Sequence, residues 1–133
     1  MKIFIIDDDR EFSNVVEEMI LRGVGSVEIK IQHFTNAIAA INATAEDVPD
    51  LIFLDVLLDG PDGFTFLNEM QSYEDLAQVP VVLLTSLDFT GRDLKRYGVV
   101  SILNKSEMTP EQINKLVEQY GRIEAGKGEE DDK

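Results

Sequence analysis

Four short and nearly uninterrupted apolar runs constrain the fold of this chain more than any other feature of its sequence. Continuous runs of this length are typical of strands that are buried on both faces of a parallel sheet. A fifth segment, Val27 to Ile31, alternates apolar and charged residues, which indicates a more exposed strand at the edge of the sheet. The four buried runs are Ile3 to Ile6, Leu51 to Leu54, Val81 to Leu84 and Val99 to Leu103.

Segments with a helical period lie between these runs. The apolar residues from Phe12 to Ile20 recur at helical spacing, and Gly23 provides a stop. The same spacing recurs from Ile113 to Tyr120, after Thr109 and Gln112, which can form a capping box. Three further helices are predicted over residues 36–43, 63–72 and 90–97, the last with Thr90 and Asp93 as a capping pair.

Strands that are separated by helices need right-handed crossovers, and these produce a parallel sheet that is covered on both faces. We therefore predict an α/β fold: a doubly wound, five-stranded parallel sheet with helices on both faces. A length of 133 residues fits one domain. The end of the chain is rich in Gly, Glu and Asp, so we expect a domain over residues 1–122 and an acidic flexible tail over residues 123–133.

Charge and composition narrow the classes of partner. The chain carries 12 Lys and Arg residues against 26 Asp and Glu residues, a net charge of −14. This field repels phosphate backbones and anionic lipids, so we expect no direct binding to nucleic acid or to a membrane. There are no cysteines, which excludes disulfides and thiolate chemistry, and no apolar stretch approaches a membrane span. We expect a cytoplasmic protein.

Polar side chains stand where the predicted strands end. In an open parallel sheet, ligands bind beyond the carboxyl ends of the strands, so residues from separate strand ends meet at one edge. His33 follows the alternating segment and is more simply explained as a structural or solvated residue. The residues gathered at the other strand ends are Asp7, Asp8, Asp9, Asp55, Thr85, Ser86, Asn104 and Lys105.

The carboxylates of this set require a cation. Two carboxylates about 4 Å apart repel by roughly 4 kcal/mol at an effective dielectric constant near 20, and Lys105 alone cannot balance all of them. Oxygen ligands favour Mg²⁺, with Mn²⁺ as a substitute. A divalent ion, Asp55 as a carboxylate nucleophile, the Thr85 hydroxyl and the Lys105 amine form a minimal set for phosphoryl transfer.

Five short motifs that contain these polar residues follow one another along the chain. They are Ile5-Ile6-Asp7-Asp8-Asp9, Leu54-Asp55, Asp62-Gly63-Phe64, Leu84-Thr85-Ser86 and Lys105. With these motifs at these spacings, the chain resembles the receiver domain of two-component response regulators over Lys2 to about Tyr120, as a single-domain receiver. The resemblance implies a flavodoxin-like sheet with strand order 2-1-3-4-5. It also implies a signalling module rather than an enzyme.

The resemblance implies a role for each residue of the set. Asp55 matches the phosphoacceptor, which takes a phosphoryl group from a phosphohistidine of a sensor histidine kinase or a histidine phosphotransfer protein. Thr85 matches the switch hydroxyl and Lys105 the lysine that pairs with the phosphoryl group. The phosphorylated state is expected to change binding to a downstream protein that the sequence does not identify.

The same resemblance implies a metal site for Mg²⁺. Asp8 matches the principal metal-binding acid, Asp7 its water-mediated neighbour, and Asp55 completes the acidic set. Leu57 would contribute its backbone carbonyl. Asp9 has no matching role and can instead cap the helix that follows.

Two positions near the lysine depart from the family pattern. Ser106 stands where a proline in a cis peptide bond usually follows the lysine, so we expect the loop to hold Lys105 differently. Ile102 stands where an aromatic ring often couples to the threonine. Without that ring, we expect activation to be muted or routed through Phe89 or Tyr97.

Further departures lie in the loops around the acceptor. Asp59 occupies a usual proline position and can reach the metal or form a turn. Leu57 and Leu87 fill the two variable positions that flank the phosphoryl site, and both are apolar. We expect them to hinder attacking water and to prolong the phosphorylated state.

Two alternative functions remain open at this level. In a phosphatase that resembles the haloacid-dehalogenase-like group, Asp7 would be the nucleophile and Asp9 the acid, with Thr85 and Lys105 in support. That hypothesis leaves no role for Asp55. In the other, a degenerate receiver acts only as a scaffold and is never phosphorylated.

Overall fold

The computed structural model describes residues 1–23, 28–58, 60–87 and 94–131, with side chains described up to Tyr120. Five parallel strands form one sheet in the order β2-β1-β3-β4-β5, which confirms the predicted fold class and strand order. The strands are β1 (Lys2–Ile6), β2 (Lys30–Phe34), β3 (Leu51–Leu54), β4 (Val81–Thr85) and β5 (Val99–Asn104). The helices are α1 (Arg10–Gly23), α2 (Ala37–Thr44), α3 (Gly63–Gln71), the short 3-10 helix η1 (Lys95–Tyr97) and α4 (Pro110–Asp131).

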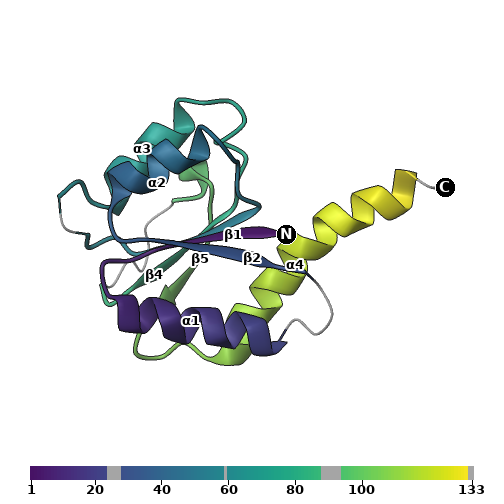
Figure 1. Cartoon of the computed structure of the whole chain (residues 1–133), viewed down its shortest axis with the longest axis horizontal. Helices are drawn as coiled ribbons and strands as arrows, with labels where there is room; N and C mark the ends of the chain where they lie inside the picture. Colours follow the sequence, from purple (N-terminus) through teal and green to yellow (C-terminus); the bar gives the residue numbers. More distant parts are fainter. Residues whose placement is uncertain (24–27, 59, 88–93, 132–133) are drawn as a thin grey trace.

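Helices cover both faces of the sheet (Figure 1). α2 and α3 pack together on one face, and α1 and α4 pack together on the other. Successive β1 residues alternate between the two cores: Phe4 and Ile6 contact the core under α2 and α3, while Ile3 and Ile5 contact the core under α1 and α4. Because β1 and β3 are buried on both faces, the residues that follow them are held on a rigid support.

Local capping explains where two of the helices begin. Asp62 accepts a hydrogen bond from the Thr65 N–H at 3.0 Å and starts α3. At α4, the Thr109 N–H donates to Gln112 Oε1 at 2.9 Å and the Gln112 N–H donates to Thr109 Oγ1 at 3.2 Å. This reciprocal pair confirms the predicted capping box.

The edge strand lies later in the chain than the alternating sequence predicts. β2 spans Lys30–Phe34 rather than Val27 to Ile31, and it pairs with β1 from Lys2 opposite Lys30 to Ile6 opposite Phe34. Val27 lies outside the described residues. The register of the neighbouring strand, rather than the local alternation, decides which residues become the strand.

The predicted helix over residues 90–97 is described only near its end. There it forms the short η1, and the expected capping residues Thr90 and Asp93 lie outside the described ranges. Gly98 ends η1 with a φ of 82°, a left-handed conformation that favours glycine. A Cβ at this position would also lie 3.2 Å from the Val79 carbonyl oxygen.

α4 continues further than the composition predicts. It runs to Asp131, so residues 123–131 of the expected tail are helical, and Figure 1 shows this part extending past the end of the sheet. Once a helix has a capped start, each further residue adds one local backbone bond, which does not require an apolar face. The domain boundary near residue 122 stays a prediction.

Within the described ranges, no helix combines the length and the apolar content that crossing a bilayer requires.

Candidate functional site

Three carboxylates converge at the carboxyl edge of the central strands. Asp7 follows β1 and Asp55 follows β3, and these two strands are neighbours in the sheet. Asp7 is 2% exposed and Asp55 5% exposed, whereas Asp8 is exposed. One oxygen from each of Asp7, Asp8 and Asp55 lies within 4.8 Å of the other two. The chemistry of this donor set, three carboxylate groups, fits a hard divalent cation such as Mg²⁺.

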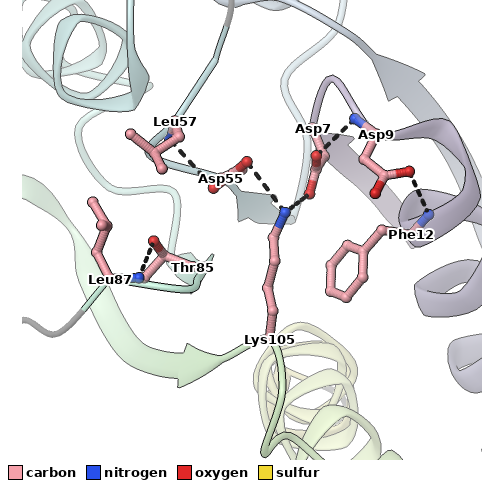
Figure 2. Close-up of polar contacts among 8 residues, drawn as sticks. All are labelled: Asp7, Asp9, Phe12, Asp55, Leu57, Thr85, Leu87 and Lys105. Carbon is pink, nitrogen blue, oxygen red and sulfur yellow. Dashed lines mark hydrogen bonds and ion pairs between the residues drawn. The ribbon is translucent and has the colours of Figure 1, made fainter.

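The Lys105 ammonium enters this cluster from the end of β5 (Figure 2). Its Nζ lies 2.7 Å from Asp7 Oδ2 and 3.2 Å from Asp55 Oδ2. The backbone N–H of Lys105 donates to the Thr85 carbonyl at 3.0 Å, which continues the pairing of β4 with β5 beyond the strand. The amine therefore lies where an anion bound to Asp55 would meet it.

The electrostatics of the site favour additional positive charge. Burial, followed by the charge of Asp7, raises the pKa of Asp55 above its ordinary 3.8, although Lys105 and the Leu57 N–H act in the opposite direction. Burial alone would lower the pKa of Lys105. Hydrogen bonds and charges from Asp7 and Asp55 outweigh that effect, so its pKa is raised above 10.5. Lys105 thus stays charged, yet it does not compensate both buried carboxylates.

The start of α3 packs directly against the backbone of the proposed acceptor. The Gly63 N–H donates to the Val56 carbonyl at 2.8 Å. A Cβ at Gly63 would lie 2.7 Å from the Asp55 carbonyl oxygen and 2.8 Å from Val56 Cα, so a larger residue would displace this backbone. The Asp62-Gly63 motif therefore has a structural reason: it caps α3 and lets the helix approach Asp55 closely.

Thr85 and Leu87 lie on the opposite side of Lys105 from Asp7 in Figure 2. Thr85 is fully buried, and its Oγ1 accepts a hydrogen bond from the Leu87 N–H at 3.1 Å. A hydroxyl that accepts in this way still has its own proton to donate. Leu57, whose N–H donates to Asp55 Oδ1 at 3.2 Å, is 53% exposed, and Leu87 is 40% exposed.

Two polar residues near the strand ends, Asp9 and His33, are not part of the cluster of Asp7, Asp8 and Asp55 and have other partners. Asp9 accepts from the Phe12 N–H at 3.2 Å and so caps α1, which is the structural alternative that the sequence left open. His33 Nε2 lies 3.0 Å from Glu17 Oε1 and links β2 to α1. Asp59 falls outside the described residues.

The loop after Lys105 is closed by a side chain. No cis peptide bond occurs within the described ranges, and the Lys105–Ser106 bond is trans. Asn104 Oδ1 accepts from the Ser106 N–H at 2.8 Å and from the Ser106 hydroxyl at 2.6 Å. The sequence placed Asn104 at the strand end but gave it no role. Asn side chains often accept a hydrogen bond from the backbone N–H two residues later, which is called an Asx turn. The Asn at position 104 is therefore the sequence signal that could have predicted this turn.

A doubly wound parallel sheet with strand order 2-1-3-4-5 places the chain in the flavodoxin-like class of α/β proteins, and its acids and lysine cluster at the carboxyl edge of that sheet. Within that class, the family model described as "Response regulator receiver domain" matches residues 3–118. The chain belongs to the response regulator receiver domain family, as its motifs indicated. This family is a phosphoacceptor signalling module of two-component systems rather than an enzyme. The family match favours the receiver hypothesis over the phosphatase alternative, whose expected acid, Asp9, has one carboxylate oxygen in the cap of α1.

Individual relatives agree with this assignment. Response regulator PleD of Caulobacter vibrioides is 31% identical over 90 residues, which cover 68% of this chain and 19% of that protein. The chain thus matches about a fifth of this relative's length.

Solved structures share the fold at lower identity. The signal receiver domain of a putative Luxo repressor protein from Vibrio parahaemolyticus has a TM-score of 0.80 at 17% identity, covering 95% of this chain and 94% of that chain. The receiver domain of sensor histidine kinase PA1611 from Pseudomonas aeruginosa has a TM-score of 0.74 at 21% identity, covering 90% and 95%. A magnesium ion is coordinated in the active site cleft of that second structure.

Proposed function

We propose that Asp55 accepts a phosphoryl group from a phosphohistidine of a sensor histidine kinase or a histidine phosphotransfer protein. The observation that carries this proposal is the position of the Lys105 amine, between two buried carboxylates and 3.2 Å from Asp55 Oδ2. Three acids and one lysine at a strand edge have no packing function that would explain burying Asp7 and Asp55 together. Phosphoryl transfer requires such a set of fixed charges around a nucleophile.

The acidic cluster would hold Mg²⁺, with Mn²⁺ as a substitute. Asp7, Asp8 and Asp55 would supply carboxylate oxygens, and Leu57 would supply its backbone carbonyl. The 4.8 Å cluster and the raised pKa of Asp55, which reflects its burial and the charge of Asp7, support this assignment. When bound, the ion neutralises charge on the carboxylates and on the oxygens of the transferring phosphoryl group.

The transfer itself exchanges one bond to phosphorus for another. An Asp55 carboxylate oxygen attacks the phosphorus, the nitrogen–phosphorus bond of the phosphohistidine breaks, and the imidazole nitrogen keeps the electron pair of that bond. Asp55 becomes an aspartyl phosphate. Lys105 then pairs with a phosphoryl oxygen, and the Thr85 hydroxyl donates a hydrogen bond to another.

The aspartyl phosphate would act as a switch that changes binding to a downstream protein. The contact between Thr85 Oγ1 and the Leu87 N–H supports this, because a movement of Thr85 toward the phosphoryl group would also move Leu87. Ile102, which is 37% exposed on β5, offers no aromatic ring for the usual coupling. Activation through Tyr97 or Phe89 stays a prediction, and Phe89 lies outside the described residues. A cytoplasmic location also stays a prediction.

Intact mass spectrometry after incubation with Mg²⁺ and a small acyl phosphate tests the proposal. We expect one phosphoryl adduct on the wild type and none on Asp55→Asn or in the presence of a chelator. An adduct of equal yield on Asp55→Asn would refute the assignment of the acceptor. If Mg²⁺ binds but no adduct forms on the wild type, the scaffold alternative is favoured.

A further inference from the structure

Lys105 has a backbone that is fixed and a side chain that needs a separate restraint. The Lys105 N–H is bonded to the Thr85 carbonyl, and the next residue is held in the turn that Asn104 forms. A lysine still has four rotatable bonds beyond its backbone, and its ammonium has no fixed direction of approach to a carboxylate. A backbone anchor alone therefore does not place Nζ between Asp7 and Asp55.

The ring of Phe12 provides a contact at the far end of this side chain. Lys105 Nζ lies over the ring, 4.5 Å from its centroid (Figure 2). An ammonium group over an aromatic face is attracted by the negative charge density of that face. Phe12 is half-buried and packs against the core under α1 and α4, so the ring itself has little freedom.

The position of Phe12 is tied back to the acidic cluster. Its N–H donates to Asp9 Oδ1 at 3.2 Å, and the Asp9 N–H donates to Asp7 Oδ1 at 2.9 Å. Asp7 Oδ2 in turn pairs with Lys105 at 2.7 Å. Asp7, Asp9, Phe12 and Lys105 thus form a closed ring of contacts, and Figure 2 shows these four side chains together.

We propose that Phe12 is a positioning residue for Lys105, and that its ring directs the ammonium toward the Asp7 and Asp55 carboxylates. The effect on phosphoryl transfer rests on the proposed function, whereas the effect on the position of Lys105 does not. Asp9 then has a defined part: it caps α1 at the point that presents Phe12 to the lysine.

Two variants of Phe12 distinguish the effect of its aromatic face from the effect of its size. Phe12→Tyr keeps the aromatic face, whereas Phe12→Leu keeps an apolar side chain without one. Met19→Ala is a matched control, because Met19 is also half-buried on α1 and packs against the same core. Circular dichroism would establish that all three variants are folded.

The first measurement is the chemical shift of the Lys105 Cε–Hε group in labelled protein, assigned by its loss in Lys105→Met. Protons held over an aromatic ring are shifted upfield. We expect this shift in the wild type, in Phe12→Tyr and in Met19→Ala, which establishes that the amine lies over the ring. Its position is followed by nuclear Overhauser effects between Lys105 Hε and the Asp55 Hβ protons, which we expect to weaken in Phe12→Leu and to persist in the other variants. If the wild type shows no upfield shift, or if Phe12→Tyr loses it, the proposal is wrong.

The second measurement is the rate of phosphoryl adduct formation with Mg²⁺ and a small acyl phosphate. From the energies of cation–π contacts, we expect a loss of roughly 3-fold to 30-fold in Phe12→Leu and little change in Phe12→Tyr. An equal loss of rate in Met19→Ala would show that Phe12 acts only through packing, which would contradict the proposal. If the wild type forms no adduct, the proposed function fails, and the nuclear Overhauser effects of Lys105 in Phe12→Leu still decide the role of Phe12: unchanged effects would overturn it.

Discussion

The two halves of the site are built on different kinds of strand. Asp7 and Asp55 follow β1 and β3, which lie inside the sheet and are almost entirely buried. Lys105 follows β5, an edge strand on which Val100 is 42% and Ile102 37% exposed. The acidic half is fixed by the packing of the whole core, whereas the lysine half is fixed by a few side chains.

This difference predicts that the two halves respond differently to substitution. Moving the acidic half would require rearranging buried strands, so it can hold closely spaced like charges. The lysine half depends on an Asx turn and on one aromatic contact, which single substitutions can remove. It is also the half in which Ser106 and Ile102 depart from the family pattern. We therefore expect large, all-or-none effects in the first half and graded effects in the second.

The largest effect is expected from metal binding in the acidic half. Mg²⁺ at a free concentration of 100 times its Kd should raise the free energy of unfolding by about 2.7 kcal/mol. Asp8→Asn should lose most of this gain, because it removes a ligand charge. Urea denaturation with and without Mg²⁺ measures the difference.

The neighbouring acid provides the control for metal binding. Asp9→Asn keeps a side chain that can cap α1, so it should keep the full Mg²⁺ gain. If Asp9→Asn loses the gain and Asp8→Asn retains it, the metal site has been assigned to the wrong acids.

The pH dependence of stability without metal tests the same half. Since the pKa of Asp55 is raised by burial and by Asp7, the folded state binds its proton more tightly than the unfolded state does. The contribution of Asp55 to stability should therefore fall as pH rises from about 3.8 through the folded pKa, by about 1.4 kcal/mol for each unit of the shift. Asp55→Asn should remove this decline in urea titrations with a chelator present. A steeper decline in the variant would contradict the sign.

A smaller effect is expected in the lysine half. Asn104→Ala removes the acceptor for the Ser106 N–H and hydroxyl, which should cost about 1 kcal/mol of stability and slow adduct formation several-fold. Ser106→Ala keeps the backbone bond to Asn104 and is the matched control, with a smaller change in both. Equal rates for the wild type and Asn104→Ala would show that the turn does not position Lys105.

The smallest effect on the fold is expected at Leu57 and Leu87. Both are exposed beside the acceptor, so Leu57→Asn and Leu87→Asn should change the free energy of unfolding by less than about 0.5 kcal/mol. Each should shorten the lifetime of the phosphorylated state, since a polar side chain can orient a water molecule for attack. Decay of the adduct, followed by mass spectrometry, measures the lifetime. A longer lifetime in either variant would contradict the role of the two leucines in hindering water.

Much of the fold follows from local sequence patterns. The two errors of the prediction, at β2 and at the end of α4, both lie where the apolar pattern is weak. The continuous runs ending at Ile6, Leu54 and Leu84 predicted central strands, because burial on both faces leaves a direct mark in composition. β2 was placed three residues too early, because at a half-exposed edge strand the alternation is weak and pairing with β1 sets the register. The helical end of α4 was missed because its residues carry no apolar period.

The features of the site also divide into those that the sequence predicts and those that only the structure shows. The sequence by itself determined which acids, hydroxyl and amine stand at strand ends, because parallel strands bring their carboxyl ends to one edge. Only the tertiary structure decided that Asp9 caps α1, that Asn104 closes the turn after Lys105, and that the Phe12 ring lies over the lysine. The contact between Phe12 and Lys105 joins residues far apart in the chain, and it depends on how α1 and the end of β5 pack, which no local pattern encodes.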